Sequence, residues 1–363
     1  ASKLISQELR TPFAAELAVE YDAVRLRTAN RTTRGTLFAY PDAIKQGLQI
    51  NWRDYTPEQP KQLGITQFEN VPLSELVPFI DWTPFFISWD LAGKYPKVLE
   101  DEVVGEAARD LFKDAQVMLD KLIEDGTLQA NGVVGIWPAN RVGSDDIALY
   151  SDNTRSQELA RCHHLRQQLQ KPGASEQLLS LADYIAPQQS GVNDYLGGFA
   201  VTTGLGAEAL AQQYEQAGDD YSAIMVKALA DRLAEAFAEY LHQRVRREIW
   251  GYASEEALDN EALIGEKYRG IRPAPGYPAC PDHTEKATLF KLLNAPGNCG
   301  MALTESFAMT PAASVSGWYF AHPDAKYFNV GKIDRDQLAD IAQRKQMVPE
   351  ECEKWLRPVL IEV

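Results

Sequence analysis

The chain has 363 residues, 45% of them hydrophobic and 24% charged, a composition typical of a globular protein with an ample core. Its formal net charge of −15 argues against nucleic acid as a main partner, because phosphates are bound by basic surfaces. No apolar run approaches the roughly 20 residues of a membrane-spanning helix, and the first residues contain no hydrophobic signal core. Because its four cysteines are widely scattered, we expect a cytoplasmic protein with reduced thiols that binds neither nucleic acid nor membrane.

The N-terminal part of the chain predicts an amphipathic helix followed by a linker. Residues 4–24 carry apolar side chains at helical spacing. Residues 28–36, TANRTTRGT, are small, polar and basic, as in a linker. A helix in this position either folds back on the main body or is the tail of a neighbouring module.

The rest of the chain mixes helical and strand patterns. Residues 37–73 are rich in proline and glycine and predict short strands and irregular chain. Helical spacing predicts helices over residues 101–126, 156–171, 221–250 and 334–345. Strands are predicted over residues 131–143, 194–204 and parts of 301–333, where a tight turn is expected at 322–325. The order lacks a regular βαβ rhythm, so it favours an α+β fold over a doubly wound sheet.

The segment GLGAEA, residues 204–209, formally matches the dinucleotide-binding pattern G-x-G-x-x-A after a predicted strand. The second strand of such a unit, ending in an acidic residue about 20 positions later, is missing. Helical sequence over residues 221–250 follows instead. We therefore prefer the alternative, an ordinary helix start after a strand.

Two short groups of cysteine and histidine invite comparison with zinc sites. They lie at Cys162–His164 and Cys280–His283, with spacings that differ from the paired C-x-x-C of structural zinc sites. Ordinary buried thiols and polar histidines are the alternative, and we predict no metal ligand in this chain. Motifs for acyl or phosphoryl transfer are also missing from the sequence.

The long predicted helix carries a row of acidic residues. Asp231, Glu235 and Glu239 are spaced i, i+4 and i+8 and therefore share one face. Such a row is usually a solvated stripe. Because the neighbours of Glu235 are apolar, a carboxylate facing a cationic ligand across a half-buried cleft is an equally weighted alternative.

The segment IRPAPGYPACPDHTEK, residues 271–286, predicts a stiff, extended loop. Its prolines cannot donate to a helix or to a central strand. Arg272 can hold a carboxylate in a two-pronged contact, and Gly276 permits close approach of a ligand. As a loop residue, Arg272 is expected to be dispensable for folding. Together with acidic residues on the helix, the loop suits an amino acid that also carries a cationic group, such as a sulfonium.

The loop resembles the R-x-x-x-G-Y motif that binds S-adenosylmethionine in the activation domain of cobalamin-dependent methionine synthase. Other segments resemble that domain in the same order, and the resemblance extends from about residue 48 to the C-terminus. These segments are residues 81–115, 225–246, 304–309 and 314–327.

The resemblance implies a fold and a domain division. The expected fold is α+β, a C-shaped single domain with a twisted antiparallel sheet and flanking helices, unlike the Rossmann fold. Residues 1–35 would be the end of a preceding cobalamin-binding module plus a linker. Residues 36–363 would form the S-adenosylmethionine-binding activation domain.

The resemblance also implies a function, as one module of a methyltransferase. S-adenosylmethionine would be used, with a flavodoxin-type electron donor, to return oxidised cob(II)alamin to methylcobalamin. No D-x-H-x-x-G motif occurs in the sequence, so cobalamin would be carried by a neighbouring module, and zinc only by a separate homocysteine module. No side chain would act as a catalyst, since the task is orientation, and a monomer is expected. The alternative is a non-catalytic S-adenosylmethionine-sensing or docking domain.

The resemblance implies ligand contacts at ten positions of this sequence. They are Asp81, Glu235, Glu266, Arg272, Ala274, Gly276, Tyr277, His283, Tyr327 and Phe328. Of these, His283 is expected near the corrin ring. Phe328 stands where the family commonly has a second tyrosine, and it can pack or stack but cannot donate a hydroxyl hydrogen bond.

Overall fold

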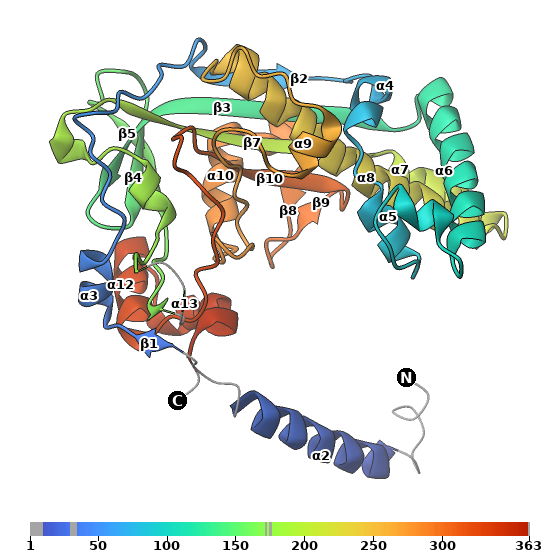
Figure 1. The fold of residues 1–363 in the computed structure, drawn as a ribbon, viewed down its shortest axis with the longest axis horizontal. Coiled ribbons are helices and arrows are strands. Elements are labelled where there is room, and N and C mark those ends of the chain that lie inside the picture. Colours follow the sequence, from blue (N-terminus) through green and yellow to red (C-terminus); the bar gives the residue numbers. More distant parts are fainter. Residues whose placement is uncertain (1–9, 30–34, 171–172, 174–175, 362–363) are drawn as a thin grey trace.

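A computed structural model of the chain describes residues 10–29, 35–170, 173 and 176–361 (Figure 1). Its centre is a six-stranded antiparallel sheet with the order β10-β7-β3-β4-β5, in which β2 also pairs with β3. The strands are β2 Gly64–Phe68, β3 Gln129–Val142, β4 Asp146–Tyr150, β5 Glu158–His163, β7 Asp194–Leu205 and β10 Ser314–Tyr319. The fold is therefore α+β, as predicted.

Helices cover both faces of the two longest strands. α8 (Asp220–Arg244) places Phe237 so close to Gly132 of β3 that a Cβ there would lie 2.9 Å from the ring. α10 (Glu285–Leu293) similarly places Leu289 2.7 Å from a Cβ built on Gly198 of β7. Because Gly198 pairs with Gly135, an odd number of residues from Gly132, the two helices lie on opposite faces. Glycine at these positions lets each helix pack closely on the sheet.

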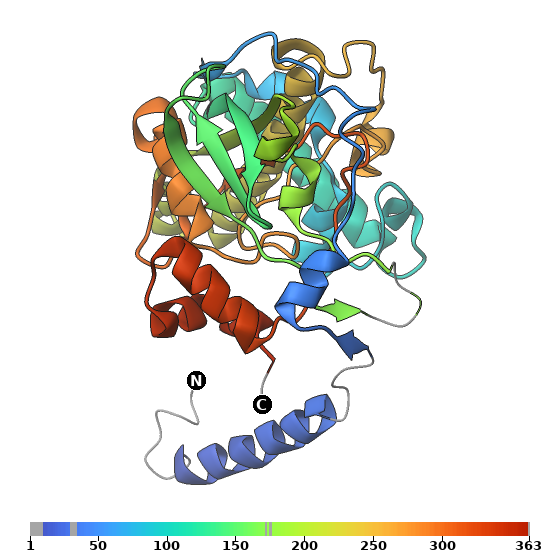
Figure 2. The same ribbon diagram turned by 90° about the vertical axis from the view of Figure 1, so that its left-hand side faces the viewer.

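Two pairs of helices flank the sheet at its two ends, α5 (Thr83–Ser88) with α6 (Gly105–Asp125) and α12 (Arg335–Lys345) with α13 (Pro349–Leu356) (Figures 1 and 2). α5 and α6 lie at one end and α12 and α13 at the other, on the same side of the long strands, which gives the expected C-shaped outline. These and the other helices are α3 Tyr40–Lys45, α4 Leu73–Leu76, α5 Thr83–Ser88, α6 Gly105–Asp125, α7 Ala207–Gln216, α9 Asn260–Ile264, α11 Ala295–Cys299, α12 Arg335–Lys345 and α13 Pro349–Leu356. Shorter elements are β1 Thr36–Leu37, β6 Leu169–Gln170, β8 Ala302–Leu303, β9 Met309–Thr310, a π-turn Val245–Ile249, and 3₁₀ turns at Val77–Phe79, Lys97–Glu100, Leu181–Tyr184, Gln188–Ser190 and Arg357–Val359.

The N-terminal helix α2 (Arg10–Ala29) lies apart from the rest of the chain in both views (Figures 1 and 2). Its apolar side chains Val19, Tyr21 and Val24 are exposed. The predicted helix is confirmed from residue 10 onward, while its start at residues 4–9 lies outside the described residues. The division of the chain at residue 35 remains a prediction.

Most of the predicted elements are present. The helix over residues 101–126 is α6, that over 334–345 is α12, and that over 221–250 is α8 with the π-turn that follows it. The turn at 322–325 is closed by a hydrogen bond from the Ala325 amide to the His322 carbonyl. The segment GLGAEA does connect β7 to α7, but α7 is followed by α8 rather than by a parallel strand. A Rossmann unit is thus ruled out there.

Two secondary-structure predictions are wrong. The described part of the predicted helix, residues 156–170, is not helical. It contains β5, which pairs with β4, buries Cys162 and exposes Leu159. The apolar spacing fits both structures, and the sheet neighbours decide between them. The region predicted as strands and irregular chain also contains α3, which has Pro41 in its first turn, where no amide donor is needed.

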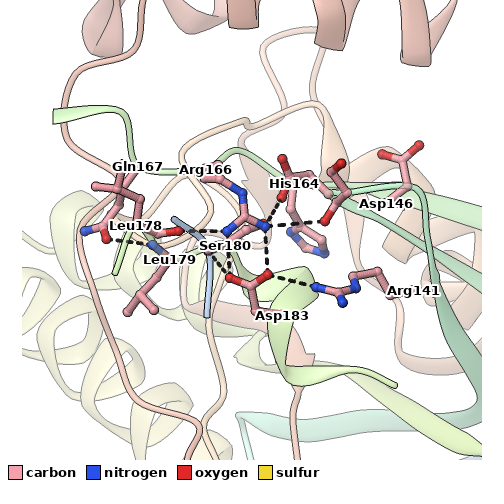
Figure 3. A network of polar contacts seen from close by, with 12 residues as sticks. Arg141, Asp146, His164, Arg166, Gln167, Leu178, Leu179, Ser180 and Asp183 are labelled. Carbon is pink, nitrogen blue, oxygen red and sulfur yellow. Dashed lines mark hydrogen bonds and ion pairs between the residues drawn. The ribbon is translucent and has the colours of Figure 1, made fainter. Parts of the chain in front are cut away.

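A buried arginine fastens the segment after β5 to the β3–β4 turn (Figure 3). Arg166 lies 2.6 Å from Asp145 and 2.7 Å from Asp183, and it also donates to the Leu178 carbonyl. All three charged side chains are almost completely buried.

In the part of the chain that the structure describes, no helix is long and apolar enough to cross a bilayer.

Candidate functional site

A cavity of about 350 Å³ lies between the loop after residue 271, α8 and β10. This volume is within the range of small-molecule sites. Most of the positions predicted to contact a ligand line it, namely Glu235, Glu266, Arg272, Ala274, Tyr277, Tyr327 and Phe328. The fold therefore collects side chains from one helix and three separate loop segments around a single space.

The other predicted positions lie beside this cavity. Asp81 lines an adjoining cavity of about 270 Å³, which shares Glu235, Glu266 and Arg272 with the first. Gly276 has a φ of +96°, and a Cβ built there would lie 2.4 Å from the His283 ring. Glycine is thus required at this position both by the backbone and by the ring.

His283 is held by the helix that follows it. Lys286 donates to Nδ1 of His283 at 3.1 Å. Burial and the Lys286 charge lower the pKa of His283 below its usual value, so the imidazole is neutral at pH 7. Lys345 of α12 lies 2.6 Å from both Asp282 and Glu285 and thereby fixes the chain on either side of the histidine.

The loop is extended only over its first residues. Ile271 and Phe320 exchange backbone hydrogen bonds, and the Trp318 amide donates to the Pro273 carbonyl, so residues 271–273 run along β10. Beyond Pro273 the chain turns compactly, with the Gly276 amide bonded to the Cys280 carbonyl at 2.7 Å. The prediction of an extended loop is therefore correct to Pro273 and wrong after it.

Arg272 is tightly held rather than free. Its Nη2 lies 2.7 Å from Oε2 of Glu239, and its Nη1 donates to Nδ1 of His242 at 3.2 Å and to the Tyr268 hydroxyl at 3.1 Å. Its amide donates to the Tyr327 hydroxyl at 3.0 Å. Only 20% of its side chain is exposed. Against the expectation that Arg272 is dispensable for folding, its removal would take from the buried Glu239 its close partner and leave only Arg246 at 3.9 Å, so we expect a loss of stability.

Nε of Arg272 has no acceptor within the described ranges of the chain. Arg272 also lines both cavities, so we expect this donor to be available to an anion bound there.

The acidic row on α8 divides into two parts with different roles. Glu235 is exposed and lines both cavities, whereas Asp231 is exposed and lines neither. Glu239 is buried and paired with Arg272. The solvated-stripe interpretation holds for Asp231, and the cleft-facing interpretation describes the place of Glu235.

Sequence reasoning missed two residues that hold the arginine, His242 and Tyr268. His242 lies three positions after Glu239, so both side chains leave α8 on the same face. Burial, with the charges of Arg246 and Arg272, lowers the pKa of His242 far below its usual value. Burial also raises the pKa of Tyr268, so both groups are neutral at pH 7. In the sequence, the only signal for His242 was its position seven residues after Glu235, which puts both on the same face of the helix.

The cysteine and histidine groups have structural environments. Cys162 and Cys280 are buried, and burial raises the pKa of each thiol. His163 contacts Asp146 at 2.9 Å. Over the described ranges of the chain, no group of three or more potential metal ligands comes together.

Comparison with known proteins places the chain in a family. The family model described as vitamin B12 dependent methionine synthase, activation domain, matches residues 72–346. The chain belongs to this family. A crystal structure described as the MetH reactivation domain bound to AdoHcy is similar, with a TM-score of 0.87 and 56% sequence identity. The match covers 90% of this chain and 99% of that one. An activation domain is one module of a methyltransferase, and the α+β single-domain fold agrees with that of the similar structure.

Proposed function

We propose that this chain binds S-adenosylmethionine in the cavity between the Arg272 loop and α8, and supports the reductive remethylation of oxidised cobalamin. The observation that carries the proposal is the arrangement of charge around the cavity. Arg272 supplies an anion-binding donor, while Glu235 and Glu266 line the same space. The positive charge of the arginine matches the carboxylate of S-adenosylmethionine, and the negative charges of the two glutamates match its ammonium and sulfonium groups.

Aromatic side chains support the same ligand. The rings of Tyr277 and Tyr327 line the cavity and are 63% and 37% exposed. Aromatic faces attract cations such as a sulfonium and stack on flat rings such as adenine. Phe328, also in the lining, offers a ring but no hydroxyl. That the similar structure binds AdoHcy, which shares the adenosyl group, adds support.

The chain's own residues have the task of binding and orientation. Arg272 and Glu266 would hold the amino-acid end and Glu235 would face the sulfonium, whose methyl group points out of the cavity. Cobalamin, bound by a neighbouring module of the parent chain, would supply the nucleophile. The sulfonium is already a good leaving group, so no general base is required, and proximity and alignment account for the protein's contribution.

The proposed partners follow from this role. They are a cobalamin-bearing module in the same parent chain and a flavodoxin-type electron donor, and the isolated chain would be a monomer. Residues of this chain provide no D-x-H-x-x-G motif, which agrees with cobalamin being carried elsewhere. The residues that line the cavity instead fit S-adenosylmethionine.

The test is a calorimetric titration with S-adenosylmethionine, followed by a remethylation assay with cobalamin on its own module. Arg272→Lys keeps the charge but loses the planar fork, so we expect affinity to fall at least about tenfold. Failure of the unsubstituted chain to bind S-adenosylmethionine would contradict the proposal. Binding without any remethylation would favour the second candidate, a sensing or docking domain.

A further inference from the structure

The carboxylate-binding arginine is the end of a buried row of alternating charges. Arg246 is fully buried, lies 2.7 Å from Glu256 and 3.9 Å from Glu239, and Glu239 in turn contacts Arg272. The order Glu256, Arg246, Glu239, Arg272 alternates in sign. A ligand carboxylate at Arg272 would continue the alternation.

His242 lies beside this row and completes the surroundings of Arg272. Its ring is fully buried, stacked on Tyr319 at 5.0 Å and edge-on to Tyr268 at 4.8 Å between centroids. Nδ1 accepts from Arg272 at 3.2 Å, and Nε2 lies 3.5 Å from the Tyr252 hydroxyl. The ring has no freedom to turn without losing both contacts.

A neutral acceptor suits this position better than a second acid. Glu239 already offsets one positive charge at Arg272, and another carboxylate would weaken the attraction for an anionic ligand. An imidazole flanked by Arg246 and Arg272 stays neutral, since burial and both cations oppose its protonation. His242 can therefore fix the direction of the guanidinium without cancelling its charge.

We infer that His242 is a positioning residue that orients Arg272 toward the carboxylate of the ligand and so makes the site selective for carboxylate-bearing ligands. This inference rests on the proposed function. His242 would act through Arg272, since it lines neither of the two cavities that Arg272 lines. Its effect should thus appear only with ligands that Arg272 holds.

The experiment compares S-adenosylmethionine with its decarboxylated form, which lacks the group that Arg272 would hold, by calorimetry on the whole chain. His242→Leu should weaken S-adenosylmethionine about tenfold, the scale of one hydrogen bond to a charged group. The decarboxylated ligand should change less than about twofold. His242→Asn keeps an acceptor at the position of Nδ1 and should restore most of the selectivity.

Further variants separate positioning from general stability. In an Arg272→Met background, His242→Leu should have no added effect on either ligand. Leu229→Ala, a buried change on the same helix outside the cavities, should lower the unfolding temperature but leave the affinity ratio unchanged. If the His242→Leu chain does not fold, His242→Gln takes its place in the experiment. The longer glutamine side chain puts its amide at the position of Nε2 rather than Nδ1, so this variant should lose the selectivity that His242→Asn keeps.

Equal weakening of both ligands, or a full effect of His242→Leu in the Arg272→Met background, would overturn the inference alone. If the unsubstituted chain bound neither ligand, the proposed function would fail and this inference with it. Intact selectivity in a folded His242→Gln chain would likewise show that the histidine does not position Arg272.

Discussion

Arg272 and Glu239 form an ion pair that is largely withdrawn from water, and this changes how the arginine is tested. Removing one partner of a buried pair costs about 3–5 kcal/mol of stability. Arg272→Ala would therefore lower stability and binding together. A surface arginine such as Arg161, whose pair with Glu158 is 37% and 38% exposed, carries no such penalty.

Glu235 offers the clearest test of charge at the candidate site. Glu235→Gln keeps the volume and removes the charge, so S-adenosylmethionine should weaken more than S-adenosylhomocysteine, which lacks the sulfonium. Because Glu235 is exposed, we expect about 1 kcal/mol, or roughly fivefold in affinity. Calorimetry with both ligands measures this, with Asp231→Asn on the same helix as control. Equal weakening of the two ligands would return Glu235 to the role of a solvated acid.

His164 gives a prediction on pH and stability. Among the described residues neither of its buried ring nitrogens has a hydrogen-bond partner, and burial lowers its pKa from 6.5 to about 4. Between those values the unfolded chain takes up a proton that the folded chain excludes, so stability falls as the pH falls. Relative to the unsubstituted chain, His164→Leu should change little at pH 7 and gain about 2 kcal/mol at pH 5. Urea unfolding at both pH values measures it, and an identical difference at the two would contradict the prediction.

At the scale of elements, α8 links the sheet to the site. Its apolar face packs on β3 and β7, while Glu235, Glu239 and His242 leave it toward the Arg272 loop. The π-turn Val245–Ile249 directly follows and contains the buried Arg246. A π-turn contains one residue more than an α-helical turn, and such turns are frequent near functional sites. One helix thus supplies both the core contact and the surroundings of the arginine.

The Arg166 network tests how a loop segment is fastened to the sheet (Figure 3). Arg166→Met leaves Asp145 and Asp183 buried with their main partner removed, so we expect a loss of about 3–5 kcal/mol in the free energy of unfolding. The matched control is Arg161→Met, an exposed pair that should cost less than about 1 kcal/mol. Denaturant midpoints compare the two variants. Similar losses would mean that the network contributes no more than a surface pair.

For the whole molecule, connection to a cobalamin-bearing module should matter more than any single contact. Mixed in trans, such a module should support slow remethylation, because cobalt and methyl donor meet only by diffusion. Fusion through residues 1–35 should raise the rate strongly, since a linker gives an effective concentration of about a millimolar. Methyl transfer from labelled S-adenosylmethionine under reducing conditions measures both forms. Equal rates, or methionine made from homocysteine by the isolated chain, would contradict this.

Local patterns in the sequence were enough to predict several elements of the fold. The apolar spacing of α6, α8 and α12 and the buried runs of β3 and β7 predict them directly, because each pattern repeats with the period of its own structure. The pattern around β5 was ambiguous. Its apolar residues suit a helix equally well, and only pairing with β4 selects the strand.

The candidate site was predicted only as far as a resemblance and local chemistry reach. Arg272, Gly276 and Tyr277 lie in one short motif, so they could be named from the sequence. The contact between Arg272 and His242 joins residues 30 positions apart, and the burial of Glu239 depends on how α8 lies against the loop. The sequence alone therefore determined which groups are proposed to bind the ligand. The tertiary structure decided which of them face the cavity and which hold the others in place, because burial and pairing depend on neighbours distant in the chain.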